Sequence, residues 1–326
     1  MSKIIISKPE KTISGKIQLT GSKSESNRAL IMQALSNGQV TVENLSKAAD
    51  TVTLDKILKS QFSGTESTLD VGPAGTAMRF LAAYAAIQTG EIILTGSARM
   101  KQRPIGILVD ALRTLGAEIS YVENIGFPPL RIHGPINQKT GSVTIKADIS
   151  SQYISALLLI APILPEGLQI TFDGELTSKP YVDMTLAMLE QAGISCIWAE
   201  NSVSIKSQNF NKSSITVEPD WSAASYWYAM VALSDAGELF LPGLNQYSLQ
   251  GDSKITEIMA NFGITSQFKD GGVYLKKEDK KLERKIFDFK ECPDLAQTVI
   301  VCCAALGHDA TFTGPVSYTH LTLPTN

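Results

Sequence analysis

Glycines that end apolar helices recur through this chain at matching places in a repeated pattern. Five times an Ala- and Leu-rich stretch ends near a glycine and continues as a short alternating run, which predicts helix, glycine stop and strand. These glycines are Gly38, Gly90, Gly167, Gly237 and Gly307. In four copies a second glycine stands 26 positions later, as Gly116 stands after Gly90. A repeat of this length predicts a duplicated supersecondary unit.

Each unit is predicted to run strand, helix, strand, helix, strand, with the first helix apolar on all sides and the second amphipathic. Such units bury the first helix only by packing around one another, so three should form one domain. We therefore expect a first domain at residues 15–219. Residues 1–14, with a strand at 3–7, and residues 220–316 should form an incomplete second domain, because a fifth copy would need its second glycine at position 333.

Composition excludes several classes of protein. The 29 basic and 32 acidic side chains give a net charge of −3, which argues against nucleic-acid binding. The longest apolar run, residues 156–164, contains Pro162 and is far shorter than the roughly 18 residues of a membrane span. Without a recognisable leader, we expect a cytoplasmic protein. The four cysteines have no metal-ligand spacing and are expected to be core residues.

The segments before the first helices carry more function-type residues than packing requires. They are Gly21 to Arg28, Gly72 to Arg79 and Ser150 to Gln152. They offer hydroxyls and free backbone N–H groups at helix starts, with cationic side chains beside them, a combination that suits an oxyanion. N-capping alone explains the hydroxyls of any single copy. It does not require Lys23, Arg28 or Gln152.

A second basic segment, Arg99 to Ile105, precedes an amphipathic helix expected to start near Pro104, where an anion could also bind. The alternative is a solvated cluster of charges. Ser178 and Tyr181 occupy the matching place in the third unit, although Tyr181 could equally pack its ring at the core boundary. A basic site in an acidic protein indicates a small ligand with several anionic groups. No glycine motif of a dinucleotide site or a P-loop is present in the sequence.

Seven motifs, in this order, resemble those of the 5-enolpyruvylshikimate-3-phosphate synthase family: GSKSESNRAL, GPAGTAMRFL, MKQRPIGILVDALRTLGA, SSQYISALL, ELTSKPYVD, QGD and CPDLAQT. The resemblance covers residues 20 to about 315. It implies an α/β fold of two domains, each built of three βαβαββ units. It also implies a transferase of the shikimate pathway, which joins shikimate 3-phosphate to phosphoenolpyruvate and releases phosphate without a metal or an organic cofactor.

The resemblance also implies roles for single residues. Lys23 would touch both substrates, and Gly75 and Arg103 would contact phosphoenolpyruvate. Asp294 would bind the shikimate hydroxyl and accept its proton. The remaining shikimate 3-phosphate contacts would be Ser24, Arg28, Ser150, Ser151, Gln152, Ser178 and Tyr181. Pro73 and Phe80 depart from the residues that many relatives have, Asn and Pro, which bears on fine geometry and inhibitor response.

The implied reaction assigns acid and base roles to Lys23 and Asp294. The 5-hydroxyl of shikimate 3-phosphate must lose a proton as it attacks phosphoenolpyruvate, whose methylene carbon gains one. Lys23 and Asp294 are predicted to lie in different domains, so the resemblance implies that the site closes on binding.

Two alternatives stay open at this point: a non-catalytic anion-binding protein, and the UDP-N-acetylglucosamine enolpyruvyltransferase of the same fold. The second uses a loop cysteine, and none is present at residues 99–103. Residues 317–326 fit no unit and are expected to be foreign to the gene. Because family members carry about another hundred residues, we expect this chain, as a monomer, to bind shikimate 3-phosphate weakly and to turn over negligibly.

Overall fold

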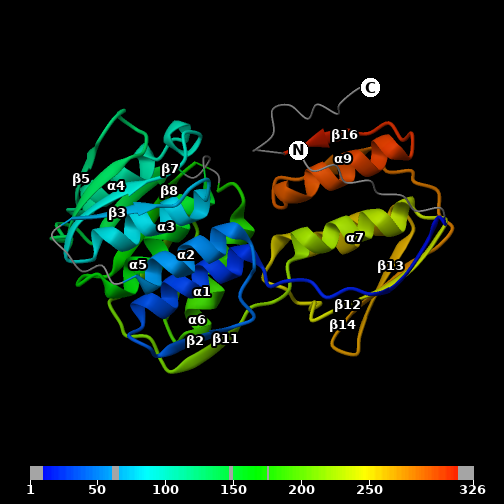
Figure 1. The fold of residues 1–326 in the computed structure, drawn as a ribbon, viewed down its shortest axis with the longest axis horizontal. Helices are drawn as coiled ribbons and strands as arrows, with labels where there is room; N and C mark the ends of the chain where they lie inside the picture. Colours follow the sequence, from blue (N-terminus) through cyan, green and yellow to red (C-terminus); the bar gives the residue numbers. More distant parts are fainter. Residues whose placement is uncertain (1–9, 61–65, 147–149, 175, 315–326) are drawn as a thin grey trace. The chain divides into compact units, whose positions relative to one another are not determined.

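The computed structural model describes residues 10–60, 66–146, 150–174 and 176–314. The chain separates into two units (Figure 1). We call Thr20–Val217 the large unit, and Met1–Leu19 with Glu218–Asn326 the small unit. The strand expected at residues 3–7 and the tail at 317–326 lie outside the described residues, as does Gly64, the second glycine of the first copy.

The large unit alternates helices and strands along its sequence. Its helices are α1 (Lys23–Leu35), α2 (Ala49–Lys59), α3 (Gly75–Ala86), α4 (Gly106–Leu115), α5 (Ser151–Ile160) and α6 (Lys179–Gln191), with 3-10 turns η1 (Met100–Gln102) and η2 (Ala161–Ile163). Its strands are β2 (Val40–Glu43), β3 (Glu66–Asp70), β4 (Gly90–Thr95), β5 (Glu118–Tyr121), β6 (Leu130–Gly134), β7 (Ser142–Lys146), β8 (Leu168–Asp173), β9 (Cys196–Ala199), β10 (Ser202–Ile205) and β11 (Ser213–Thr216).

The small unit begins with β1 (Thr12–Lys16) and resumes after the large unit. The resumed part contains α7 (Trp221–Leu233), β12 (Ala236–Pro242), η3 (Gly251–Lys254), α8 (Ile255–Ala260), β13 (Ile264–Lys269), β14 (Gly272–Lys277), β15 (Ile286–Asp288), η4 (Pro293–Leu295), α9 (Ala296–Ala305) and β16 (Thr311–Thr313). Together with the large unit, this confirms the predicted mixed α/β fold.

Sheet topology repeats as the glycine pattern predicted. Three four-stranded sheets share one design, with strand orders β3-β4-β6-β5, β7-β8-β10-β9 and β1-β12-β14-β13. In each, the first two strands are parallel and the remaining pairs are antiparallel. The parallel pairs β11-β2 and β15-β16 repeat the first step of the design. Duplication therefore extends from the sequence to the strand pairing.

The first helices of the large unit are buried, as their composition predicted. Every residue of α3 except Thr76 is buried, and every residue of α5 except Gln152. In α1 the buried set includes polar side chains, among them Asn27 and Arg28, which each make hydrogen bonds. Because a buried polar group needs a hydrogen-bond partner, these polar side chains do more in the core than fill space.

The glycine stops are mostly as predicted. Gly38, Gly90, Gly167 and Gly307 adopt positive φ, and Gly116 ends α4 in the left-handed region at φ 109°. Gly237 is the exception, because it is not among the glycines with positive φ and lies inside β12 beside Ile13 of β1. There a Cβ would lie 2.9 Å from Ser234 Oγ and from Val231 Cγ1, so close packing, not helix termination, requires glycine.

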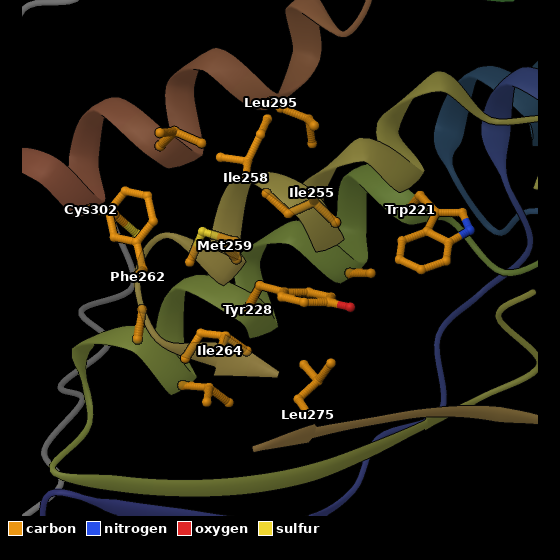
Figure 2. Close-up of a cluster of buried hydrophobic side chains, with 14 of the residues drawn as sticks. Trp221, Tyr228, Ile255, Ile258, Met259, Phe262, Ile264, Leu275, Leu295 and Cys302 are labelled. Atoms are coloured by element: carbon orange, nitrogen blue, oxygen red, sulfur yellow. The ribbon is translucent and has the colours of Figure 1, made fainter. Parts of the chain in front are cut away.

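The core of the small unit joins α7, α8 and the β13–β14 hairpin. Figure 2 shows Tyr228, Met259 and Leu275, one from each of these elements, converging in this cluster. The Tyr228 hydroxyl shares a hydrogen bond of 2.9 Å with Ser266 Oγ, which satisfies its polar end.

Two helices of the small unit are less buried than the first helices of the large unit. Helices α7 and α9 pack side by side (Figure 1), yet Tyr226, Met230 and Leu233 on α7 and Val301 on α9 are exposed. In the large unit, by contrast, three first helices enclose one another's apolar faces. Among the described residues the small unit has only two such helices, so part of each face stays in contact with solvent.

Within the described part of the chain, no helix is both long enough and apolar enough to cross a membrane.

Candidate functional site

The start of α1 presents cationic and polar side chains above a capped first turn. Ser22 is the N-cap, and its hydroxyl accepts from the backbone N–H of Glu25 at 3.4 Å. Lys23 is exposed and Ser24 half-buried. Capping therefore accounts for Ser22 and does not account for Lys23 or Ser24. The start of α5 is similar, since Ser150 caps by accepting from the N–H of Gln152.

Arg28 lies in the interior of the large unit, 2% exposed. Its Nε donates to Thr185 Oγ1 at 2.7 Å, Nη1 to the Ser24 carbonyl at 2.9 Å, and Nη2 to the Tyr181 carbonyl at 3.0 Å. Burial lowers the pKa of Arg28 to about 10, against the opposing effect of Tyr181 and Glu25, so the guanidinium stays charged at pH 7.

The contacts of Arg28 place four helix starts together. Besides Thr185 on α6, its guanidinium reaches Ser155 Oγ on α5 at 3.0 Å and lies 5.5 Å from the ring centroid of Phe80 on α3. Arg28, Phe80, Ser155 and Thr185 all belong to the second turns of their helices. The N-termini of α1, α3, α5 and α6 must therefore lie at one end of the helix cluster. Their backbone N–H groups and dipoles give that end a positive potential suited to anions.

Gly75 and Arg103 are in close contact. A Cβ placed on Gly75 would lie 2.1 Å from Nη1 of Arg103, so only glycine lets this guanidinium rest against the start of α3. Arg79 secures the surrounding loop, because its Nη1 donates to the Gly75 carbonyl at 3.1 Å and its Nη2 to the Pro104 carbonyl at 2.8 Å. Helix α4 begins at Gly106, close to the predicted start near Pro104, and residues 100–102 form a separate 3-10 turn.

Two further contacts link the helix starts. Gln152 Nε2 donates to Thr76 Oγ1 at 3.3 Å, joining the starts of α5 and α3. Ser178 precedes α6 in the left-handed conformation, with φ 53° and ψ 40°. For a residue with a side chain this backbone is strained, a condition often found at ligand sites.

Ten of the eleven predicted site residues thus belong to the helix starts of the large unit and the loop beside them. They are Lys23, Ser24, Arg28, Gly75, Arg103, Ser150, Ser151, Gln152, Ser178 and Tyr181. Contacts tie Ser24 and Tyr181 to Arg28, and Gly75 to Arg103. Tyr181 contacts Arg28 in two ways. Its carbonyl accepts a hydrogen bond from the guanidinium, and its ring centroid lies 5.9 Å from that group.

The eleventh residue, Asp294, lies in the small unit beside a second carboxyl group. Asp294 is half-buried in η4, and Asp252 in η3 is 4% exposed. Burial, followed by the charge of Asp294, raises the pKa of Asp252 to about 7, while a hydrogen bond from the Ser222 hydroxyl opposes the shift. Asp252 Oδ1 has no partner among the described residues. A buried acid beside a half-buried one is an arrangement that can hold and release a proton near neutral pH.

Sequence reasoning assigned no individual role to Asp252, Arg79, Ser155 or Thr185. Asp252 stands in the QGD motif, and Arg79 ends the GPAGTAMR segment, so motif membership was a usable signal for both. Ser155 and Thr185 lie inside apolar helices as isolated hydroxyls, which single-helix patterns do not distinguish from tolerated core residues.

Comparison with known proteins identifies the family. The family model of EPSP synthase (3-phosphoshikimate 1-carboxyvinyltransferase) matches residues 7–315. The chain belongs to the EPSP synthase family. The implied membership drawn from the seven motifs is therefore confirmed.

Relatives within the EPSP synthase family match most of the chain. The 3-phosphoshikimate 1-carboxyvinyltransferase of Bacteroides fragilis (strain YCH46) is 48% identical over 304 residues, which are 93% of this chain and 73% of the relative. That of Shewanella halifaxensis (strain HAW-EB4) is 37% identical over 316 residues, covering 89% of this chain and 73% of the relative.

Solved structures support the fold. A structure of EPSP synthase from Acinetobacter baumannii superposes with a TM-score of 0.70 at 19% identity, covering 90% of this chain and 71% of that one. A second structure from the same organism gives 0.67 at 20% identity. At this identity the likeness bears on the fold of the EPSP synthase family and not on single residues.

Proposed function

We propose that the chain functions in the transfer of the enolpyruvyl group of phosphoenolpyruvate to the 5-hydroxyl of shikimate 3-phosphate, with release of phosphate. Family membership supports this reaction in the shikimate pathway. The observation that supports the site most directly is the set of Arg28 contacts, because they bring four helix N-termini of the large unit to one place. Both substrates are phosphorylated acids, and such a place favours them.

Within this proposal the large unit binds shikimate 3-phosphate at the starts of α1, α5 and α6. The ammonium group comes from Lys23, and hydroxyls come from Ser24 and Ser178. The remaining polar groups are the hydroxyls of Ser150 and Ser151 and the amide of Gln152. Arg103, held against Gly75, takes an anionic group of phosphoenolpyruvate. Fixing two anions in one orientation offsets their mutual repulsion, so positioning contributes strongly to the rate.

The proton transfers need an acid and a base. We assign the base to Asp294, which takes the proton of the 5-hydroxyl as that oxygen attacks C2 of phosphoenolpyruvate. Lys23 is the assigned acid, which delivers a proton to the methylene carbon. Lys23, now an uncharged amine, then takes a proton back from the methyl group of the tetrahedral adduct as the C–O bond to phosphate breaks, which restores the enolpyruvyl double bond, and the proton held by Asp294 leaves with phosphate. Lys23 belongs to the large unit and Asp294 to the small unit, so the complete reaction requires both.

Calorimetry with shikimate 3-phosphate tests the binding site first. We expect saturable binding that Lys23→Ala weakens at least tenfold, a loss typical of a charge-assisted contact. Binding unaffected by Lys23→Ala would contradict the site. A phosphate-release assay with both substrates follows. Phosphate release at an enzymatic rate would support the proposed transfer and overturn the expectation of negligible turnover, whereas binding without phosphate release would favour the non-catalytic anion-binding alternative. Monomeric state and cytoplasmic location stay predictions, and size-exclusion chromatography tests the first.

A further inference from the structure

Two buried hydroxyls hold one side of the Arg28 guanidinium. Thr185 Oγ1 accepts from Nε at 2.7 Å and Ser155 Oγ from Nη2 at 3.0 Å. The two hydroxyl oxygens lie 2.8 Å apart, and Thr185 Oγ1 lies 2.8 Å from the Tyr181 carbonyl. Both side chains are fully buried, at 0% exposure. The three residues form a closed polar group inside otherwise apolar helices.

The contacts allow two assignments of hydrogens, and the shorter distances favour one of them, because the other needs Ser155 to donate to the Tyr181 carbonyl at 3.5 Å. Because both oxygens accept from the guanidinium, each hydroxyl hydrogen must point elsewhere. Thr185 donates to the Tyr181 carbonyl at 2.8 Å, and Ser155 donates to Thr185 Oγ1 at 2.8 Å. This arrangement satisfies both hydroxyls and fixes their acceptor lone pairs toward Arg28. A satisfied network of this kind holds a side chain in one orientation.

With the guanidinium held in this orientation, Nη1 of Arg28 faces the first turn of α1. Nη1 donates to the Ser24 carbonyl at 2.9 Å, in the first turn of α1, and Nη2 also bonds the Tyr181 carbonyl at 3.0 Å. Ser24 and Tyr181 are both among the predicted shikimate 3-phosphate contacts. Rotation of the guanidinium about its own axis would break these bonds together with those to the hydroxyl pair.

We propose that Ser155 and Thr185 are positioning residues for shikimate 3-phosphate, acting through Arg28. They touch neither substrate nor reacting atoms. They set the plane of the guanidinium and, through it, the main chain at Ser24 and Tyr181. This inference rests on the proposed function, because it assumes that these groups face the ligand.

Thr185→Val is the main test, since valine keeps the shape of threonine and removes the hydroxyl. We expect the dissociation constant for shikimate 3-phosphate, measured by calorimetry, to rise about tenfold or more. Thr185→Ser, which keeps the hydroxyl, should stay within about threefold of the unmodified chain. Ser155→Ala should weaken binding in the same direction. The double variant should weaken it by less than the product of the two single effects, because both act on one guanidinium.

A control separates positioning from general destabilisation. Leu189→Ala, one turn farther along α6 at a fully buried site, should lower the urea midpoint as a core truncation and leave shikimate 3-phosphate affinity within about threefold. If Thr185→Val does not unfold cooperatively, Ser155→Ala, which removes one oxygen atom, provides the comparison.

The outcomes are distinct. Failure of the unmodified chain to bind shikimate 3-phosphate would reject the proposed function itself. Binding that is unchanged in both Thr185→Val and Ser155→Ala would reject the positioning role alone. Equal weakening in Thr185→Val and Thr185→Ser would also reject it, because the hydroxyl would then be irrelevant.

Discussion

Replacing Gly75 by alanine should separate ligand binding from stability. The added Cβ would lie 2.1 Å from Nη1, 2.8 Å from Cζ and 2.9 Å from Nη2 of Arg103. These atoms are the far end of a flexible, exposed side chain, so the guanidinium moves and the backbone stays. Gly75 is the first residue of α3 and is not among the residues with positive φ, so alanine fits its backbone.

The two effects have opposite signs. Alanine in place of glycine in a helix stabilises by up to about 1 kcal/mol, so the free energy of unfolding should be unchanged or slightly higher. A displaced Arg103 loses a charge-assisted hydrogen bond to phosphoenolpyruvate, worth about 1.5–3 kcal/mol. At about 1.4 kcal/mol per factor of ten, the affinity for phosphoenolpyruvate should fall roughly 10- to 100-fold.

The assay is phosphoenolpyruvate binding at saturating shikimate 3-phosphate, with urea unfolding in parallel. Gly106→Ala is the matched control, because Gly106 is likewise the first residue of a helix and its nearest neighbour to a new Cβ, the Cα of Gly126, is 3.5 Å away. Equal phosphoenolpyruvate affinity in Gly75→Ala, Gly106→Ala and the unmodified chain would refute the reasoning that Arg103 holds this substrate.

Two other substitutions test features of the separate units. The pKa of Asp252 in the folded chain is raised to about 7. Above about pH 4 the unfolded chain releases this proton while the folded chain keeps it. The free energy of unfolding should therefore fall as the pH rises from about 4 to about 7. Asp252→Asn should remove this contribution, and urea titrations of both chains at several pH values, followed by tryptophan fluorescence, measure the difference; identical pH dependence would contradict it. Ser178→Gly should relieve the left-handed strain and raise the free energy of unfolding by about 1 kcal/mol, while calorimetry shows severalfold weaker shikimate 3-phosphate binding; unchanged binding would remove the hydroxyl from the site.

Local patterns predicted the repeat but not its long-range contacts. The glycine stops and the alternating runs are signals within a few residues, and so the strand–helix–strand design was accessible from sequence. The bonds from Arg28 to Ser155 and Thr185 span 127 and 157 residues. No periodicity encodes such a distance, and the motif alone placed Arg28 at the ligand without its buried partners.

The solvent exposure of individual side chains was harder to predict from the sequence than the secondary structure. The apolar composition of α7 and α9 resembles that of α3 and α5, but burial depends on how many neighbouring helices are available. Exposed Met230 and Val301 therefore differ from their large-unit counterparts through context and not through their own chemistry. The same holds for Asp252, whose raised pKa comes from burial and a nearby carboxylate that the QGD motif does not reveal.

The meeting of four helix N-termini has a consequence for handling the protein. Like ends of helix dipoles repel, and the buried charge of Arg28 adds to that repulsion. Any oxyanion seated there relieves it, so sulfate or inorganic phosphate should raise the melting temperature in proportion to the logarithm of its concentration once the site is nearly saturated. The same buffer ions should compete with the substrates. Affinities measured in phosphate buffer will therefore understate those in a buffer without oxyanions.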